Sequence, residues 1–295
     1  MKSFIKSLAL FVLLTVSIYP QYSRGKVLEG KTIESEILGK DVHYSVYLPF
    51  DYETSERYYP VVYLLHGYGG HDIDWIQYGE ANIQCDKAIA ENKIPPMILV
   101  MPDADNTWYM NNYEGTVLYE DFFIKEFIPF IETEYRIRKE KKFRGIAGLS
   151  MGGHGALFFT LKYPDIFQAC AAFSPGTHTK EEVIAMDLER WNRLFSNVYI
   201  NDVTGEKRVT EHFSANDVLT ITKNIDPEKI KFTRFYIDCG DDDFLIKGNM
   251  ELHSLLIDKE IEHEFRVRDG RHNWFYWRSG LIEGLEYIGV GFHQQ

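Results

Sequence analysis

The sequence predicts an α/β fold in which a mainly parallel central sheet has helices on both faces. Three observations carry this prediction: short apolar runs that are almost unbroken, segments with helical spacing between them, and the regular alternation of the two. Unbroken apolar runs are typical of strands covered on both faces, and the alternation of strand and helix favours parallel pairing. The 295 residues are 45% hydrophobic and 26% charged, a balance that can bury a full core and excludes a disordered chain.

Residues 1–23 predict a secretory signal peptide, which leaves residues 24–295 for one folded domain. Lys2 and Lys6 form a short basic start, and an apolar run of 11 residues follows from Leu8 to Ile18. That run is well short of the roughly 20 residues that a membrane-spanning helix needs, so an uncleaved anchor is disfavoured. We therefore expect a secreted or periplasmic protein with no membrane attachment after cleavage. A buried N-terminal segment is the alternative.

The predicted element order begins with two antiparallel strands. Residues 33–37 and 42–48 alternate with period two, as half-buried strands do, and Gly39-Lys40 between them predicts a turn. The apolar runs predict buried strands at residues 61–65, 97–101, 143–147, 169–173 and 235–238. Helical spacing predicts helices at residues 81–92, 119–135, 153–163, 250–259 and 275–288. Pro129 should kink the second helix or stand in its first turn after a break.

One stretch, residues 176–230, interrupts the alternation of strand and helix. It is polar and loop-rich, with compact apolar clusters only at residues 183–186 and 191–195. In open α/β sheets ligands bind beyond the carboxyl ends of the strands, so an insertion at this place is suited to form a lid or a substrate wall. The alternative is a long surface excursion without a role.

Charge and cysteine content exclude several kinds of partner. Lys and Arg number 32 and Asp and Glu 44, and the resulting formal net charge of −12 repels a polyphosphate, so no nucleic-acid partner is expected. Cys85, Cys170 and Cys239 are too few and too widely spaced for a disulfide framework or a zinc cluster. We expect buried free thiols, with a bridge between Cys170 and Cys239 as the alternative.

The segment Gly148-Leu149-Ser150-Met151-Gly152-Gly153 follows a predicted strand and precedes a predicted helix. A sharp strand-to-helix turn of this kind holds its serine in strained backbone geometry, and the neighbouring glycines leave room for the crowded backbone. The turn presents the serine hydroxyl at the edge of the sheet. We therefore predict that Ser150 is a nucleophile.

A serine nucleophile needs a base to take its proton, and the base needs an acidic partner that fixes its tautomer. In folds with this turn the partners follow in the order Ser, acid, His, each after a later strand. The strand predicted near residues 235–239 leads into Asp241-Asp242-Asp243, and residues 264–268 lead to His272. Position thus predicts an acid within the aspartate run and His272 as the base.

Other polar residues near these positions have simpler interpretations. His154 is disfavoured as the base, because a residue four positions along the same helix cannot easily reach the serine oxygen. Asp241 and Asp242 predict a solvated acidic loop, since one short cluster supplies too few of the 6–8 oxygens that calcium takes. His66, at the end of a strand, is expected to be a structural hydrogen-bonding residue.

Together with the serine motif, four further segments resemble the esterase D-like group of α/β-hydrolases. They are Leu64-Leu65-His66-Gly67-Tyr68-Gly69-Gly70, Pro102-Asp103, Gly240-x-x-Asp243-Phe244-Leu245 and His272-x-Trp274. Within this group the sequence is most similar to carbohydrate esterase family 1, the feruloyl and acetyl xylan esterases. The likeness covers roughly residues 30 to 290 in matching order. It implies an α/β-hydrolase fold, with residues 24–295 as the catalytic domain.

The resemblance also implies the roles of individual residues. It assigns Ser150, Asp243 and His272 to the catalytic triad, and it selects Asp243 because the family's acid stands three residues after the glycine that ends its strand. It assigns the oxyanion hole to the backbone N–H groups of Tyr68 and Met151. Neither a metal nor an organic cofactor is implied.

The function implied by the resemblance is hydrolysis of feruloyl or acetyl esters on plant polysaccharides or oligosaccharides through an acyl-enzyme. S-formylglutathione hydrolases and mycolyl-type acyltransferases are related alternatives, and secretion disfavours the first of them. A non-enzymatic, carbohydrate-binding relative would need a missing triad member, whereas all three positions are filled. Four aromatic residues are predicted to line a substrate cleft, with simple packing as the alternative. They are Trp75, Trp108, Tyr109 and Trp274.

Overall fold

The central sheet of the computed structural model, which describes residues 23–292, contains eight strands in the spatial order β1-β2-β4-β3-β5-β6-β7-β8. The strands are β1 (Lys26–Ser35), β2 (Lys40–Leu48), β3 (Val61–Leu65), β4 (Ile98–Pro102), β5 (Arg144–Leu149), β6 (Ala169–Phe173), β7 (Arg234–Gly240) and β8 (His263–Arg268). β2 pairs antiparallel with both β1 and β4, and all other neighbours are parallel. The predicted α/β fold with a mainly parallel sheet is confirmed.

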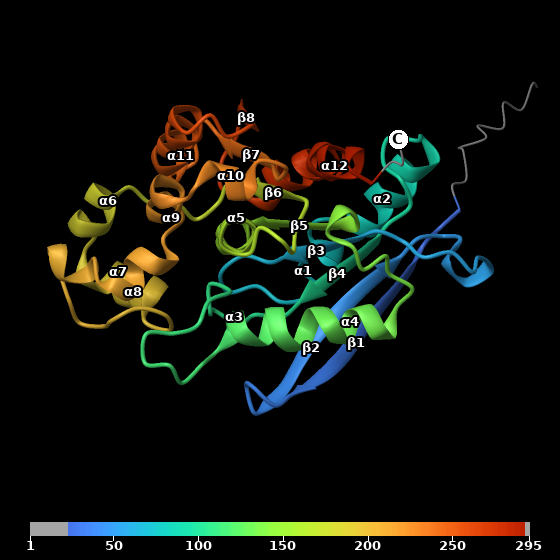
Figure 1. The fold of residues 1–295 in the computed structure, drawn as a ribbon, viewed down its shortest axis with the longest axis horizontal. Coiled ribbons are helices and arrows are strands. Elements are labelled where there is room, and N and C mark those ends of the chain that lie inside the picture. Colours follow the sequence, from blue (N-terminus) through green and yellow to red (C-terminus); the bar gives the residue numbers. More distant parts are fainter. Residues whose placement is uncertain (1–22, 293–295) are drawn as a thin grey trace, which may run out of the picture.

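Helices cover both faces of this sheet (Figure 1). The helices around it are α1 (Asp74–Gln77), α2 (Ala81–Ala90), α3 (Tyr119–Phe122), α4 (Ile128–Glu134), α5 (Met151–Lys162), α11 (Ile246–Asp258) and α12 (Trp274–Val290). Consecutive residues of a strand point to opposite faces, so Val62 and Leu64 of β3 belong to the core cluster that includes residues of α2 and α12, whereas Tyr63 belongs to the cluster that includes residues of α4 and α5. Every residue of β3 is buried, which explains its unbroken apolar run.

The helix predicted at residues 119–135 changes its hydrogen-bonding pattern before Pro129. α3 continues into a π-helical segment, Phe123–Phe127, and α4 then begins with Pro129 in its first turn. A proline is tolerated at this place, because the first turn of a helix makes least use of its N–H groups. Pro129 thus stands in a first helical turn, as one of its two expectations had it, but the backbone stays helical from α3 into α4, so the expected break before it is absent.

Residues 176–230 form short helices instead of the mainly loop structure that their polar sequence indicates. The helices are α6 (Lys180–Ala185), α7 (Leu188–Phe195), α8 (Glu211–Asn216), α9 (Val218–Asn224) and α10 (Pro227–Ile230). Each begins after a side chain that accepts a hydrogen bond from a backbone N–H of the first turn. The longest, α7, has eight residues, which is too short for a clear helical period in the sequence.

The insertion has a small core of its own. The ring of Trp191, which is fully buried, lies 4.9 Å from that of Phe195 and 5.9 Å from that of Tyr199, measured between centroids. Arg208 is also fully buried, lies over the Trp191 ring and donates hydrogen bonds to carbonyl oxygens within residues 183–186. Aromatic packing and a satisfied buried guanidinium thus hold the short helices together.

The cysteines behave as small buried hydrophobic residues. Cys85, Cys170 and Cys239 are all free and buried, so the alternative of a Cys170–Cys239 bridge is wrong for this structure. Burial raises the pKa of the Cys170 thiol to about 12, so this thiol is protonated at neutral pH.

The predicted signal peptide lies, apart from Ser23, outside the described residues. Within residues 23–292 no helix is both long and apolar enough to cross a bilayer.

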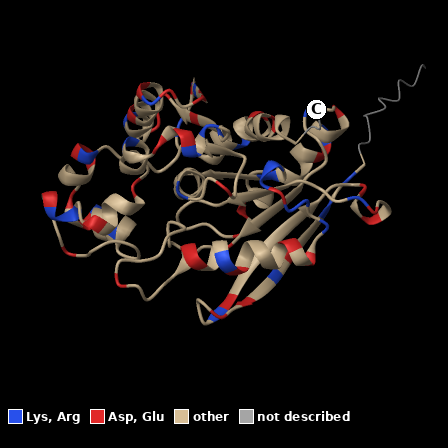
Figure 2. Ribbon diagram, in the orientation of Figure 1, with Lys and Arg blue, Asp and Glu red and all other residues tan. Residues whose placement is uncertain are grey.

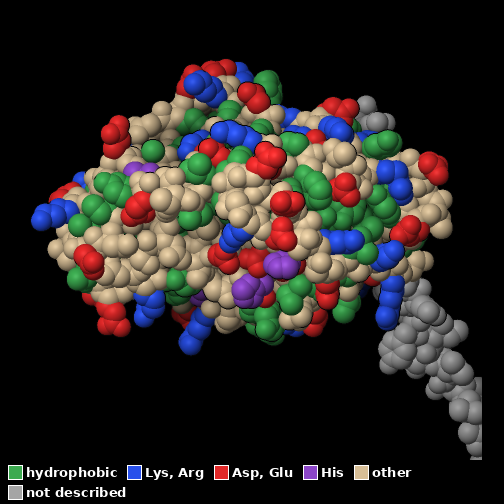
Figure 3. Space-filling view, turned by 90° about the horizontal axis from the view of Figure 1, so that it is seen from below, with side chains coloured by type: hydrophobic (Ala, Val, Ile, Leu, Met, Phe, Trp, Pro, Cys, Tyr) green, Lys and Arg blue, Asp and Glu red, His purple; other side chains and the backbone are tan. Residues whose placement is uncertain are grey.

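Acidic and basic side chains are interspersed over the fold, as Figure 2 shows. The face seen in Figure 3 likewise carries charges of both signs, with histidines beside acidic groups.

A buried ion pair between β7 and β8 leads to a prediction about stability. The Asp238 carboxylate is fully buried, lies 2.6 Å from the Arg268 guanidinium and accepts a hydrogen bond from the Tyr276 hydroxyl. Replacing Arg268 by Met should leave this charge without its ionic partner and lower the free energy of unfolding by roughly 3 kcal/mol. The matched variant Arg266→Met breaks an exposed ion pair on the same strand. It should change the free energy of unfolding by about 0.5 kcal/mol or less. Urea denaturation measures both, and equal losses would contradict the argument.

Candidate active site

Ser150 stands between β5 and α5 in a strained backbone conformation. Its φ is 54° and its ψ is −116°, a combination that residues with a side chain rarely adopt. The Ser150 N–H donates to the carbonyl oxygen of Phe173 at 2.9 Å, and the Ser150 carbonyl accepts from the N–H groups of Gly176 at 2.8 Å and His154 at 2.9 Å. The chain therefore contains the sharp strand-to-helix turn that the motif predicts.

Gly148 and Gly152 make this turn possible. A Cβ atom at position 148 would lie 2.3 Å from the carbonyl oxygen of Gly152, and one at position 152 would lie 2.4 Å from that of Leu65. Both atoms belong to backbone that cannot move aside, so only glycine fits at these positions. The N-terminus of α5 consequently packs directly against the carboxyl ends of β3 and β5.

His272 connects Ser150 to Asp243 through both of its ring nitrogens. Nε2 lies 2.9 Å from Ser150 Oγ, and Nδ1 lies 3.1 and 2.9 Å from the two carboxylate oxygens of Asp243. The three residues follow the parallel strands β5, β7 and β8, whose carboxyl ends meet at one edge of the sheet. With Nδ1–H donating to the carboxylate, Nε2 is left to accept the serine proton. The arrangement can therefore activate the hydroxyl of Ser150.

The carboxylate of Asp243 is buried, and its surroundings stabilise the charged form. Burial alone raises its pKa, but the hydrogen bond and charge of His272 and the N–H of Leu245, 2.9 Å from the carboxylate, outweigh this effect and hold the pKa below its ordinary value. The carboxylate is thus ionised at neutral pH. It can stabilise the positive charge that His272 acquires when it takes a proton.

Asp241 and Asp242 are exposed and have other partners. Asp241 accepts a hydrogen bond from the N–H of Gly270 at 3.0 Å, which ties the loop after β7 to the loop after β8. Asp242 pairs with Arg271 at 3.4 Å. Of the three consecutive aspartates, Asp243 alone reaches His272, and the other two form the acidic loop that the sequence indicates.

The segment 66–70, which follows β3, runs beside Ser150. An added Cβ at Gly67 would lie 3.5 Å from the Cβ of Ser150. His66 fixes this segment, because its Nδ1–H donates to the Gly67 carbonyl at 2.8 Å and its Nε2 accepts from the N–H of Ala104 at 2.9 Å. This is the structural role expected for His66, and burial lowers its pKa in favour of the neutral ring that both bonds require.

The two amides predicted for an oxyanion hole belong to residues that border the serine. Tyr68 directly follows Gly67 and lines the same cavity as Ser150. Met151 is the first residue of α5, and N–H groups in the first turn of a helix have no partner within the helix. Both positions are therefore suited to present a backbone donor beside Ser150.

Ser150 and His272 border a cavity of about 580 Å³ whose walls are largely aromatic. Tyr78, Phe244 and Trp274 line it, and the ring centroid of Phe244 lies 4.6 Å from that of His272. Tyr78 and Phe244 are about half exposed, at 49% and 58%, so their rings are available to a ligand. Sequence reasoning missed both residues, although the place of Phe244 directly after Asp243 was a usable signal.

Of the four aromatic residues predicted to line a cleft, Trp274 does so and the other three do not. Trp75 and Tyr109 are 1% and 0% exposed, and the ring of Trp75 packs 5.3 Å from that of Trp274, between centroids. Trp108 is 5% exposed and packs 4.8 Å from the ring of Phe195. For Trp75, Trp108 and Tyr109 the packing alternative holds, because no ligand in the cavity could reach rings this deeply buried.

The insertion reaches the cavity through α7. Leu194 lines the cavity, and its carbonyl accepts a hydrogen bond from Trp108 Nε1 at 2.9 Å. The hydroxyl of Tyr68 donates to the carbonyl of Arg193. These bonds fasten the end of α7 to the loops around Ser150, so part of the insertion forms a wall of the cavity.

His154 lies away from this proton-transfer chain. Its ring packs 5.5 Å from that of Trp108, and its Nδ1 has no hydrogen-bond partner among the described residues. Burial lowers its pKa to about 4, so the ring is neutral at pH 7.

Within residues 23–292, no group of three or more His, Cys, Asp or Glu side chains is arranged to hold a metal ion.

Comparison with known proteins places this geometry in a family. The Esterase family model matches residues 35–288. The chain is 27% identical over 240 residues to an acetyl esterase of Caldicellulosiruptor saccharolyticus, which covers 81% of this chain and 86% of that protein. It is 35% identical over 163 residues to an endo-1,4-beta-xylanase/feruloyl esterase of Xylanibacter ruminicola, where the alignment covers 53% of this chain and only 22% of that longer protein.

Solved structures agree with this placement. A ferulic acid esterase superposes with a TM-score of 0.79 at 30% identity, covering 92% of this chain and all of that one. The fold and the site together define an α/β-hydrolase of the esterase class. The chain belongs to the Esterase family, and the predicted resemblance to the feruloyl and acetyl xylan esterases is confirmed.

The buried neutral ring of His154 predicts a dependence of stability on pH. Its pKa is about 4 in the folded protein against an ordinary value of 6.5, so the unfolded chain binds more protons between these values. The contribution of the neutral His154 ring to the free energy of unfolding is therefore complete above pH 6.5, and it decreases as the pH drops toward 4. From pH 7 to pH 5 the loss due to His154 should be about 2 kcal/mol, and His154→Phe should remove it.

Urea denaturation at the two pH values measures this effect in the wild type and in His154→Phe. The exposed His43 supplies the control variant, His43→Phe, which should keep the wild-type dependence. The interpretation is wrong if all three proteins lose the same stability between pH 7 and pH 5.

Proposed function

We propose that this protein is a secreted or periplasmic serine carboxylesterase that hydrolyses feruloyl or acetyl esters on plant polysaccharides or oligosaccharides. The observation that carries the proposal is the hydrogen-bonded chain in which His272 Nε2 lies 2.9 Å from Ser150 Oγ while Nδ1 lies 2.9 Å from Asp243. Membership of the Esterase family supports ester hydrolysis, and the predicted signal peptide supports export.

In the first half of the reaction Ser150 becomes acylated. Its Oγ attacks the carbonyl carbon of the ester while His272 Nε2 takes the hydroxyl proton, and Asp243 stabilises the resulting imidazolium. The carbonyl electron pair moves onto the oxygen, where the N–H groups of Tyr68 and Met151 donate to it, each typically worth about 3 kcal/mol. The intermediate then expels the alcohol oxygen, which receives the proton from His272.

In the second half water removes the acyl group. His272 takes a proton from a water molecule whose oxygen attacks the acyl carbon, and the same two N–H groups stabilise the second oxyanion. The bond to Ser150 Oγ then breaks, and the serine oxygen recovers a proton from His272. The products are one carboxylic acid and one alcohol, and Ser150 returns to its starting state.

The aromatic cavity favours a feruloyl group over an acetyl group. The partly exposed rings of Tyr78 and Phe244, together with Trp274, offer faces and edges to a phenolic ring, and such ring pairs are stabilising beyond their buried area. A cavity of about 580 Å³ also exceeds what an acetyl group fills. The names of the acetyl esterase and feruloyl esterase relatives support both acyl groups.

Ser150→Ala should abolish the hydrolysis of methyl ferulate and 4-nitrophenyl acetate, because it removes the hydroxyl that lies 2.9 Å from His272 Nε2. The free energy of unfolding should stay within about 1 kcal/mol of the wild type, as for a change at the surface of a cavity. Initial rates and urea denaturation measure the two quantities. Ser254→Ala, on the exposed side of α11, is the control and should keep full activity. Turnover retained by Ser150→Ala would remove this residue from its role.

Asp243→Asn should slow both reactions on the order of a thousandfold or more, because the amide cannot hold His272 in the required tautomer. Asp241→Asn and Asp242→Asn are the matched controls on the same loop, and both should stay near the wild-type rate. Measurements of kcat with methyl ferulate distinguish the three positions. A large loss in Asp242→Asn with little change in Asp243→Asn would show that the acid is misassigned.

A further inference from the structure

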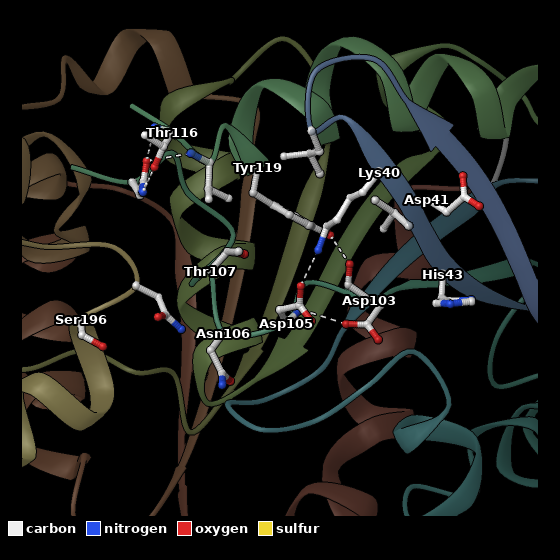
Figure 4. A pocket seen from close by; sticks show the side chains of 15 residues that line it. Lys40, Asp41, His43, Asp103, Asp105, Asn106, Thr107, Thr116, Tyr119 and Ser196 are labelled. Atoms are coloured by element: carbon white, nitrogen blue, oxygen red, sulfur yellow. Dashed lines mark hydrogen bonds and ion pairs between the residues drawn. The ribbon is translucent and has the colours of Figure 1, made fainter. Parts of the chain in front are cut away.

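Figure 4 shows a second cavity, of about 490 Å³, which shares no lining residue with the cavity of Ser150. Three segments that are distant in the sequence build it: the start of β2, the chain from residue 103 to residue 119, and residues 196–197 after α7. In Figure 4, Lys40 and Asp105 point toward one another near the centre of the view, with Thr107 and Asn106 beside Asp105 and Ser196 of the insertion at the left. A hollow of this size is typical of a small-ligand site.

Residues that line the two cavities contact one another directly. Gly69 lines the cavity of Ser150, Asn106 lines the second cavity, and the Gly69 N–H donates to Asn106 Oδ1 at 2.7 Å. In the insertion, Leu194 lines the first cavity and Ser196 lines the second. The two cavities are therefore neighbours on the protein.

The two cavities differ in the chemistry of their walls. The first is largely aromatic, whereas the second is lined mainly by hydroxyl, amide and carboxylate groups. Its charged residues are three aspartates and one lysine, an excess of two negative charges that disfavours an anionic ligand. The Lys40 ammonium, which pairs with Asp105 at 2.7 Å, disfavours a metal cation in the same place. These groups suit a neutral ligand that both donates and accepts hydrogen bonds, which is the chemistry of a sugar.

The walls of the second cavity are held in place before any ligand binds. Asn112 closes the loop 112–117, because its side-chain oxygen accepts from the N–H groups of Thr116 at 2.8 Å and Val117 at 2.9 Å. The Tyr119 hydroxyl donates to the Asp103 carbonyl at 2.9 Å. A site that is already ordered loses little conformational entropy on binding.

We propose that the second cavity binds the sugar units of the ester substrate while the acyl group occupies the aromatic cavity. This inference rests on the proposed function and assigns the saccharide side of the substrate to named residues. Among the described residues, the Asn197 side chain has no hydrogen-bond or ion-pair partner, so its amide is available to sugar hydroxyls. The exposed Lys40 ammonium can offer further donors.

The test compares two ester substrates in a double variant and a matched control. Lys40→Ala/Asn197→Ala should raise KM about tenfold for a feruloylated xylo-oligosaccharide, the effect of losing about two hydrogen bonds, and leave kcat and KM for methyl ferulate unchanged. The control Lys31→Ala/Asn224→Ala removes an exposed lysine of β1 and an exposed asparagine at the end of α9, both outside the cavity. It should leave both substrates unchanged.

Binding of an unesterified xylo-oligosaccharide, measured by saturation-transfer NMR, tests the cavity separately from catalysis. We expect binding to the wild type and the control and its loss in Lys40→Ala/Asn197→Ala. The free oligosaccharide should compete with the oligosaccharide ester and leave the hydrolysis of methyl ferulate unaffected. Absent binding, an unchanged KM, or equal inhibition of both esters would overturn the inference. If the wild type hydrolyses no ester but binds the sugar in this residue-dependent way, the proposed function fails and the sugar site stands.

Discussion

The backbone of Ser150, held at positive φ between β5 and α5, is the constraint on which the site depends. It exists because two glycines let the N-terminus of α5 pack against the ends of β3 and β5 without side chains between them. The same close packing brings the segment 66–70 beside the serine. Since β5, β7 and β8 run parallel, the loops that follow them meet at this edge, and His272 and Asp243 reach Ser150 from there.

The parts of the fold that sequence reasoning could predict are those encoded in local patterns. A strand buried on both faces needs apolar residues throughout, so β3 and its parallel neighbours were visible as unbroken runs. The strand-to-helix turn was visible because only glycine fits at 148 and 152. The choice of Asp243 among three aspartates depends on the family resemblance. The backbone turn that exposes Asp241 and buries Asp243 cannot be recognised from the composition or the periodicity of the sequence.

The parts that could not be predicted depend on which way a side chain points and on contacts between distant segments. Trp75 and Trp274 are both large aromatics near strand ends, yet the first lies beneath the second and only Trp274 lines the cavity. The insertion forms helices of at most eight residues, whose capping side chains look like ordinary loop residues in the sequence. The second cavity needs three segments to meet that are distant in the sequence, and no local pattern in the sequence indicates that they do.

The proposed chemistry requires that Ser150, activated by His272, is the residue that attacks an ester carbonyl. The most direct measurement is the mass of the intact protein after treatment with a fluorophosphonate, followed by peptide mapping of the modified residue. We expect one adduct per chain, located on Ser150, and strongly slowed labelling in His272→Ala. Labelling at another residue, or labelling of Ser150 at an unchanged rate without His272, would contradict it.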